Sequence, residues 1–394
     1  MAPNTVLDRV EDAVRRRGTD LVELSHAIHA EPELAFAEYR SCAKAQALVA
    51  ERGFEITAAA GGLDTAFRAD FGSGPLTVGV CAEYDALPEI GHACGHNIIA
   101  ASAVGAALAL ADVADQLGLS VALLGTPAEE FGGGKVLLLN AGVFDDVAVA
   151  VMVHPGPIDI AAARSLTLAA VRVQYHGREA HASAAPFLGI NAADAATVAQ
   201  VAIGLLRQQL APGQQVHGIL TEGGQVANVI PSRTEMQYTM RATEAWSLAD
   251  LQAKIGDCFL AGAVATGCEY SVEQTEPMYD ALKPDPWLAG AVREEMTRLG
   301  RTPVDAELEA ALPLGSTDMG NVTQRLPGIH PMVAVDAGGA SLHQPEFTAA
   351  AVGPSADRAV VDGAIMLARS IVRLAESGDE RDRVLAARDQ RAAS

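Results

Sequence analysis

Side chains of the types that bind divalent metal ions occur in four separate places along the chain. They are Cys94 with His96, Glu129 with Glu130, His154, and His343. Apolar stretches that predict buried strands lie at 76–82, leading into Glu83 and Asp85, and at 121–126, 147–153 and 331–336, ahead of Glu129, His154 and His343. Ligands of an open α/β sheet gather in the crevice beyond the carboxyl ends of its strands, so these segments can converge on one point. The set predicts a hydrolytic centre with two metal ions.

The tripeptide Cys94-Gly95-His96 places two good metal-ligand types two residues apart. The glycine between them allows the backbone to turn tightly. Taken alone, the tripeptide is equally compatible with a structural role, because buried cysteines often only fill space. The surrounding sequence GHACGHN favours the functional interpretation, because a second histidine and two glycines fill a core poorly.

The pair Glu129-Glu130 follows an apolar strand and Pro127 and precedes FGGG, so it is not expected on an ordinary exposed helix. Two carboxylates in one small pocket repel each other unless cations neutralise them. The pair therefore predicts bound metal, with one carboxylate as a ligand and the other left as a base. His154 and His343 are each compatible with a structural histidine when taken singly. Together with the other residues at strand ends they predict ligands.

Composition narrows the possible partners. A length of 394 residues exceeds the roughly 250–300 at which a single core stops growing, so two domains are expected. A net charge of −21 argues against nucleic acid or an anionic membrane as partner, because binding to phosphates depends on Lys and Arg. A small-molecule substrate is expected instead.

The remaining bulk features predict a cytoplasmic protein. Residues 1–20 form a charged amphipathic pattern rather than a secretion signal. The longest apolar stretch, 98–110, is shorter than the roughly 18 residues of a membrane-spanning helix and predicts a core helix. Five cysteines form no paired framework, which is typical of reduced thiols.

Residues 1–165 and 278–394 show the alternation of helix and strand that is typical of an α/β domain. A helix is expected at about 98–117 and another at 352–375, and the charged end, 378–394, is expected to fray. Between these parts, 166–277 predicts the order β-α-β-β-α-β of a ferredoxin-like domain inserted into the first.

Arg241 is a candidate substrate-binding residue on its own account. In the strand TEMQYTMRA, alternation places Met236, Tyr238 and Met240 on one face and Arg241 on the other. A planar guanidinium at the end of a strand can bind a substrate carboxylate through two hydrogen bonds. The alternative is an ordinary exposed arginine.

Several motifs together resemble one family. They are AEYDALP (82–88), GHACGHN (91–97), PAEE and FGGGK (127–135), MVHPG (152–156), GREAHAS (177–183), GINAADA (189–195), ANVIPS (227–232) and GSTDMGNV (315–322). In order and spacing the chain resembles the two-metal aminoacylase and carboxypeptidase family, which includes carboxypeptidase G and the auxin-conjugate amidohydrolases. It is most similar to the branch of p-aminobenzoyl-glutamate hydrolases and animal aminoacylase-like dipeptidases. Auxin-type members usually carry Asp at the position of Asn97 and Asp-Met at that of Glu83-Tyr84, which weakens any transfer of their substrate preference.

The resemblance implies a fold and a role for each matching residue. The implied fold is a two-metal exopeptidase-like α/β catalytic domain with an inserted ferredoxin-like α+β lid and dimerisation domain. Glu129 is the implied general base, and Asp85 orients a ligand. His181 stabilises the oxyanion, Asn228 assists Arg241 in binding the substrate, and His92 has a structural or supporting role. The implied metal ligands are Cys94, His96, Glu130, His154 and His343.

The implied activity is hydrolysis of the amide bond of an N-acyl, aminobenzoyl or aminoacyl amino acid by a metal-activated water. Two divalent ions per subunit are expected, either zinc or manganese, with cobalt also compatible. The family also implies a homodimer through the insert, with His181 acting in the neighbouring subunit. One alternative is a dipeptidase or carboxypeptidase that acts on short peptides. Another is a catalytically silent carboxylate-binding protein of the same fold, although such a protein has no need of a base at Glu129.

Overall fold

The computed structural model describes residues 5–309, 311–312 and 315–393. The chain divides into two compact units, which are described separately. The core unit comprises Met1–Arg164 and Leu282–Ser394, and the inserted unit comprises Ser165–Ala281. The sequence predicts 166–277 for this insert, and the observed unit continues to Ala281 because Tyr279 still pairs with Leu168 at the start of its first strand.

The core unit is built on a six-stranded sheet with the order β1-β2-β4-β3-β5-β11. Strands β3, β4, β5 and β11 are parallel, whereas β2 is antiparallel to both β1 and β4. Both faces of β3 are buried, as is usual for parallel strands covered on two sides. The strands are β1 Glu55–Ala58, β2 Phe67–Phe71, β3 Leu76–Ala82, β4 Leu119–Gly125, β5 Val149–Val151 and β11 Gly328–Ile329. A separate pair joins β6, His154–Gly156, to β12, Met332–Ala334.

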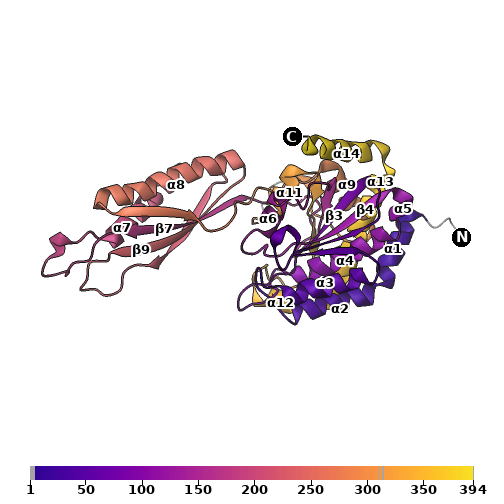
Figure 1. Cartoon of the computed structure of the whole chain (residues 1–394), viewed down its shortest axis with the longest axis horizontal. Helices are drawn as coiled ribbons and strands as arrows, with labels where there is room; N and C mark the ends of the chain where they lie inside the picture. Colours follow the sequence, from indigo (N-terminus) through magenta and orange to yellow (C-terminus); the bar gives the residue numbers. More distant parts are fainter. Residues whose placement is uncertain (1–4, 310, 313–314, 394) are drawn as a thin grey trace. The chain divides into compact units, whose positions relative to one another are not determined.

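Helices cover both faces of this sheet. Val78 and Val80 of β3 belong to an apolar cluster with the large helical layer, whereas Cys81 belongs to a second cluster on the opposite face. Figure 1 shows α2, α3 and α4 stacked beside β3 and β4. The large layer contains α1 Val6–Arg16, α2 Gly18–His29, α3 Tyr39–Ala50, α4 His96–Ala111, α9 Pro286–Arg298 and α13 Pro354–Glu376. The opposite face is covered by α6 Gly134–Asn140 and α11 Met319–Arg325.

Helix α4 is buried along its whole length, which confirms the expectation of a core helix. It ends at Ala111, earlier than expected, and a short α5, Ala114–Leu117, follows. The expected amphipathic pattern of 1–20 forms α1 and the start of α2, although residues 1–4 lie outside the described part. The remaining short elements are α10 Ala306–Glu309, α12 Pro345–Ala350 and the 3-10 turns Ala60–Gly62, Pro186–Leu188 and Arg207–Gln209.

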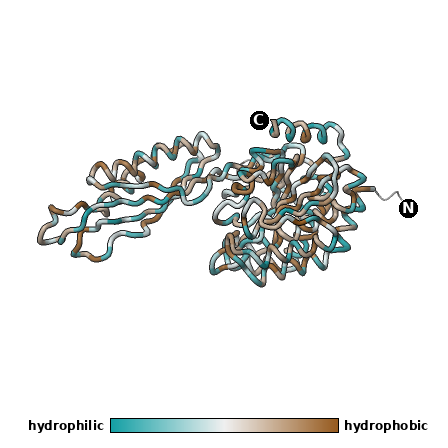
Figure 2. Tube along the Cα trace, viewed as in Figure 1, coloured by the Kyte–Doolittle hydropathy of each residue, from teal (hydrophilic) through white to brown (hydrophobic). Residues whose placement is uncertain are grey.

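The expectation that the charged end frays is wrong. Residues Gly378–Ala392 form helix α14, which is largely polar (Figure 2). Arg381 donates to the backbone oxygen of Leu117 over 2.6 Å, and Arg388 donates to that of Pro75 over 2.6 Å. These carbonyls precede β4 and β3, so the arginines satisfy acceptors at the amino ends of the strands.

The inserted unit is a four-stranded antiparallel sheet with the order β10-β7-β9-β8 and both helices on one face (Figure 1). The first and third strands of the unit are therefore central, as in a ferredoxin-like sheet. Its elements are β7 Thr167–His176, α7 Ala192–Leu206, β8 Gln215–Glu222, β9 Arg233–Ala242, α8 Ala245–Thr266 and β10 Glu269–Gln274. As expected, Met236, Tyr238 and Met240 of β9 face the buried side.

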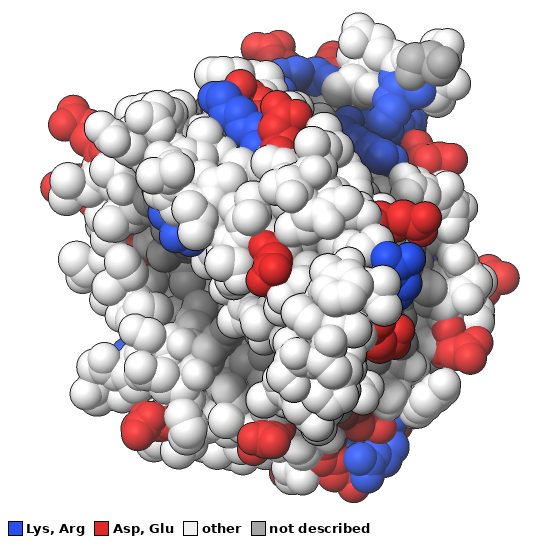
Figure 3. Space-filling view, turned by 90° about the vertical axis from the view of Figure 1, so that its left-hand side faces the viewer, with Lys and Arg blue, Asp and Glu red and all other residues white. Residues whose placement is uncertain are grey.

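Charged side chains of both signs are scattered over the face shown in Figure 3, and blue groups adjoin red ones along its top and right-hand side. Among the described residues, no helix has the length and apolar character needed to cross a membrane. All five cysteines carry free thiols, in agreement with the expectation from the sequence.

Candidate metal centre

The turn between β3 and α4 places Cys94 and His96 on either side of Gly95. Gly95 has a φ of 74°, in the left-handed region that disfavours residues with a side chain. A Cβ atom at this position would lie 2.5 Å from Cγ of Pro155, the residue after His154. The predicted tight turn is therefore confirmed, and it also lets the turn approach the segment that carries His154.

His96 is oriented by Asp85. Its Nδ1 lies 2.9 Å from Oδ1 of Asp85, and because a carboxylate accepts, Nδ1 carries the proton. Burial lowers the pKa of His96, but Asp85 more than offsets this effect and holds that pKa well above its usual value. Nε2 is left without a hydrogen-bond partner among the described residues. It faces carboxylate oxygens of Glu129 and Glu130, each at 3.8 Å.

Glu129 and Glu130 lie in a turn rather than in a helix, as expected. Ala128, just before them, has a φ of 61°, an uncommon conformation for alanine of the kind that often marks functional sites. The turn closes tightly, since a Cβ atom on Gly134 would lie 1.8 Å from the backbone oxygen of Pro127. Burial, Glu83 and Glu130 together raise the pKa of Glu129 well above its usual value. Nearby cations would reverse this effect.

His154 is the first residue of β6, so it does not follow the end of a long strand as the sequence suggested. The apolar run 147–153 is divided because β5 ends at Val151 and the chain then pairs with β12. Nδ1 of His154 donates to the backbone oxygen of Pro155 over 2.6 Å, which leaves Nε2 3.5 Å from Sγ of Cys94. Burial and the neighbouring His330 lower the pKa of His154 to about 3. A neutral imidazole with a free Nε2 is the form that binds metal ions.

His343 reaches the centre from a loop. It does not directly follow a strand, because β12 ends at Ala334. Its φ is 65°, and its backbone N–H donates to the oxygen of Ala93 over 3.0 Å, which attaches this loop to the turn carrying Cys94. Its Nε2 lies 3.5 Å from Oε2 of Glu130, and its side chain is half-exposed.

The five expected ligands come together. Their donor atoms form two groups, Cys94 with His96 and His154, and Cys94 with Glu130 and His343, and within each group all donor atoms lie within 4.8 Å of one another. Cys94 belongs to both groups. The mixture of thiol, imidazole and carboxylate suits zinc and also accommodates manganese or cobalt. Buried atoms without a partner, such as Oε1 of Glu130, fit this interpretation.

His92 is buried and lies outside these groups. Its ring stacks on that of His29, with centroids 6.0 Å apart. Its structural or supporting role stays a prediction.

The three expected substrate-binding residues lie in the inserted unit. His181 and Asn228 are neighbours there, because the N–H of Ala182 donates to the oxygen of Asn228 over 3.0 Å. Arg241 pairs with Leu168 near the other end of β9, whereas Arg233 at its start pairs with His176 next to the loop of His181. The eight residue-to-residue steps along the strand from Arg233 to Arg241 span about 26 Å. One chain therefore does not bring Asn228 to Arg241.

Sequence reasoning assigned no role to a buried group beside the centre. Lys135 Nζ lies 2.5 Å from Oε1 of Glu83 and 2.7 Å from Oδ1 of Asp318. Glu83 also forms a third group of possible ligands with His96 and Glu129. The signals in the sequence were the positions of Glu83 after β3 and of Lys135 after three glycines. His330, whose ring centroid lies 5.4 Å from that of His154, was also missed.

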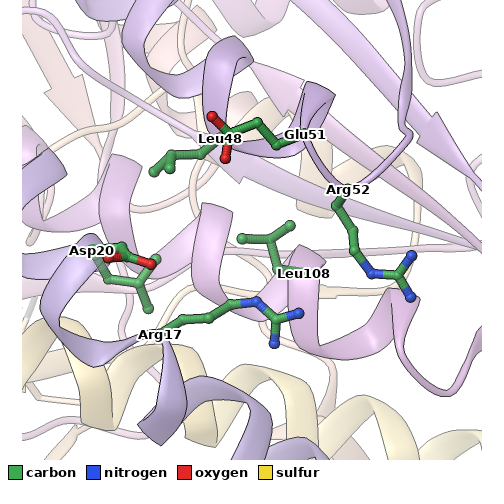
Figure 4. A pocket seen from close by; sticks show the side chains of 7 residues that line it. Arg17, Asp20, Leu48, Glu51, Arg52 and Leu108 are labelled. Atoms are coloured by element: carbon green, nitrogen blue, oxygen red, sulfur yellow. The ribbon is translucent and has the colours of Figure 1, made fainter.

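A separate hollow of about 180 Å³ is lined by residues of α2, α3 and α4 (Figure 4). Arg17 and Arg52 both contribute to it, and both pair with Asp112. The charges around this hollow are thus balanced by one another. None of the candidate ligands lines it.

Comparison with known proteins identifies the family. Residues 79–370 match the model of peptidase family M20/M25/M40. The chain is 39% identical over 363 residues to an Xaa-Arg dipeptidase of Mus musculus, covering 87% of this chain and 82% of the relative. It is 32% identical over 276 residues to one of the subunits of p-aminobenzoyl-glutamate hydrolase from Escherichia coli, covering 64% of this chain and 56% of that protein.

Solved structures share the fold. A dinuclear metal binding peptidase of the M20 family from Bacillus subtilis superposes with a TM-score of 0.68 at 22% identity, covering 91% of this chain and 99% of that one. A putative aminohydrolase from methicillin-resistant Staphylococcus aureus gives a TM-score of 0.77 at 20% identity, covering 93% and 98%. The expected mixed α/β fold is thereby confirmed. The chain belongs to peptidase family M20/M25/M40 and is a metal-dependent hydrolase of amide bonds.

Proposed function

We propose that this protein cleaves the amide bond of an N-acyl or N-aminoacyl amino acid and releases the free amino acid. The observation that carries the proposal is the convergence of Cys94, His96, Glu130, His154 and His343, with the carboxylate of Glu129 beside His96. We assign these five residues as ligands of two divalent ions. When bound, the ions supply the positive charge that acidifies a water molecule and polarises the amide carbonyl.

Glu129 is the proposed general base. Its side chain is buried beside the carboxylates of Glu83 and Glu130, both of which contribute to its raised pKa. It accepts a proton from the attacking water and delivers it to the departing amine. Asp85 contacts His96 through one oxygen and the backbone N–H of Glu130 through the other, at 2.9 Å in both cases. It thereby fixes two proposed ligands at once.

Similarity to known proteins favours a dipeptide as the substrate. Among the proteins compared, the Xaa-Arg dipeptidase matches 87% of the chain at 39% identity. We therefore place dipeptides with a carboxyl-terminal arginine first among the substrates, ahead of N-acyl amino acids and p-aminobenzoyl-glutamate. Arg241 is assigned to the substrate carboxylate, and a cytoplasmic location remains the expectation from the sequence.

We further propose a homodimer in which His181 acts in the site of the partner subunit. The chain enters the inserted unit at Ser165 and leaves it at Ala281, and Arg241 pairs with Leu168 close to both points. His181 lies at the opposite end of the same sheet. The ends of a ten-residue strand such as β7 are about 30 Å apart. A site that uses both Arg241 and His181 therefore takes them from different chains.

Edge strand β8 is the proposed contact between the subunits. The side chains of Ile219 and Leu220 in this strand are 62% and 45% exposed. In α7, Val201 and Leu205 are 57% and 71% exposed. Helix α8 packs on the other edge strand, β10, so α7 lies toward β8. An apolar edge strand with unpaired backbone groups is a template for pairing with a second copy.

The test is a hydrolysis screen of the protein after removal of metal and reloading with Mn²⁺ or Zn²⁺. Xaa-Arg dipeptides, other dipeptides, N-acetyl amino acids and p-aminobenzoyl-glutamate are compared by kcat/KM. We expect activity that is abolished by a chelator and restored by metal, with the highest value for an Xaa-Arg dipeptide. Higher values for N-acyl substrates would contradict the dipeptide assignment, and no hydrolysis of any substrate would favour a silent carboxylate-binding protein.

A further inference from the structure

The buried group of Lys135, Glu83 and Asp318 contains one cation and two carboxylates. All three side chains are fully buried, and Lys135 contacts one oxygen of each carboxylate. The backbone N–H of Lys135 also donates to the second oxygen of Asp318 over 2.8 Å. Asp318 is therefore satisfied at both oxygens, and one excess negative charge remains in the group. Uncompensated buried charge is strongly unfavourable.

The second carboxylate oxygen of Glu83, Oε2, faces His96. Oε2 is buried and has no hydrogen-bond partner among the described residues. It lies 3.6 Å from Nε2 of His96, which is also without a partner. Because Nδ1 of His96 donates to Asp85, Nε2 is the ring nitrogen available to a metal ion, which takes the place of the proton there. An imidazole nitrogen and a carboxylate oxygen 3.6 Å apart, neither with a hydrogen-bond partner among the described residues, fit a cation bound by both.

We propose that Glu83 is an oxygen ligand of the metal ion assigned to His96 and His154, in addition to the five ligands assigned above. The proposal rests on that metal centre. Lys135 holds one oxygen of Glu83 and so directs the other toward His96. The position directly after β3 gives Glu83 a rigid backbone. His96 belongs both to the group of possible ligands with Glu83 and Glu129 and to the group with Cys94 and His154, so it links Glu83 to this ion.

The test measures metal binding rather than turnover. The metal-free protein is titrated with Co²⁺, and the number of bound ions, their affinities in competition with a chelator and the visible absorption of Co²⁺ are recorded. Glu83→Gln keeps the size of the side chain and removes its charge. We expect one of two bound ions to bind about 100-fold more weakly in this variant, with a changed absorption spectrum.

The matched control is Glu295→Gln. Glu295 is also a buried, paired glutamate of the core unit, and its Oε2 lies 2.7 Å from Nε of Arg369, away from the centre. This variant is expected to bind Co²⁺ as the wild type does. Wild-type affinities and spectrum in Glu83→Gln would overturn the proposal, because Glu83 would then only balance Lys135. A wild-type protein that binds no Co²⁺ would overturn the metal centre itself.

Thermal unfolding gives an independent measurement. Glu83→Gln leaves Lys135 paired one-to-one with Asp318, so the metal-free variant should unfold at a temperature no lower than that of the wild type. The rise in Tm on adding Co²⁺ should be smaller than in the wild type. If this variant does not fold, Glu83→Asp keeps the charge and withdraws the carboxylate by one methylene. Unchanged Co²⁺ affinity in a folded Glu83→Asp protein would equally overturn the proposal.

Discussion

The core unit and the inserted unit hold their candidate functional residues in opposite ways. In the core unit, Cys94, His96 and Glu129 are buried; Cys94 and Glu129 lie on turns, His96 begins α4, and both other side chains group with that of His96. In the inserted unit, His181 and Arg241 lie near opposite ends of the sheet. One chain brings the candidate metal ligands together, whereas the proposed substrate site draws its residues from both subunits of the proposed dimer.

The difference follows from the two kinds of sheet. In the core unit, β3 and β4 are parallel, so the segments that follow them emerge at the same edge. In the inserted unit the strands are antiparallel, so successive loops alternate between the two ends. Residues on successive connections are therefore separated by the length of the sheet.

The largest effect is expected from Glu129→Gln in the core unit. Loss of the base should lower kcat by about 10⁴-fold while both metal ions are retained. Glu130→Gln should lower kcat and also lose metal, because Glu130 is a proposed ligand. Metal analysis of each purified variant beside its kinetics separates the two roles. Equal loss of metal in both variants would contradict the assignment of Glu129 as the base.

The next effect concerns the inserted unit. His181→Ala should lower kcat by about 10²–10³-fold, as loss of an oxyanion donor does. Mixing this variant with Glu129→Gln should restore roughly a quarter of wild-type activity, because half of the dimers are mixed and each has one intact site. Co-purification of differently tagged chains must first show that subunits exchange. Mixed dimers that remain inactive would show that His181 does not act across the dimer.

A smaller effect is expected at the edge of the inserted sheet. Ile219→Lys places a charge on the proposed contact and should weaken the dimer by at least about 10-fold, as edge lysines oppose strand pairing. Val272→Lys is the control, because Val272 is similarly exposed, at 47%, on the other edge strand β10. Light scattering over a dilution series measures both variants. If only the Val272 variant dissociates, the contact between the subunits is formed by β10 and not by β8.

The smallest effect is a pH dependence of stability in the core unit. Burial raises the pKa of Glu38 to about 7, although Thr65 donates to it. The carboxyl group of Glu38 therefore stays protonated in the folded protein at pH values between its pKa in the unfolded chain and about 7. The resulting stability is fully present below the unfolded pKa and is lost as pH rises through 7, by at most about 3 kcal/mol.

Glu38→Gln should remove this part of the pH dependence. Urea unfolding of the metal-free protein at about pH 5 and about pH 8, below and above the raised pKa, measures the change. Glu33→Gln is the control, since hydrogen bonds from Ser41 and Arg40 outweigh burial and lower the pKa of Glu33. If the free energy of unfolding of Glu38→Gln changes between these two pH values as much as that of the wild type, Glu38 is ionised in the folded protein throughout this range.

The sequence by itself determined the candidate ligands, whose donor atoms the structure brings together, and most elements that position them. The run 76–82 forms β3 with those bounds, and Gly95 adopts the tight turn expected between two ligand types. These features are local, because they depend on residues that are adjacent in the sequence: on strand periodicity, on turn chemistry and on the type of ligand side chain. The family resemblance supplied the roles that such patterns leave open, including the choice between Glu129 and Glu130 as the base.

Only the tertiary structure decided which distant groups meet. In the fold, Lys135 pairs with Glu83 and Asp318. The arginines of α14 donate to backbone oxygens that precede β3 and β4. Arg241 and His181 lie far apart along one sheet. A polar helix such as α14 carries no apolar pattern that predicts docking, since its partners are backbone atoms elsewhere in the chain. A buried ion pair is likewise defined by packing and register, which depend on the whole chain rather than on neighbouring residues.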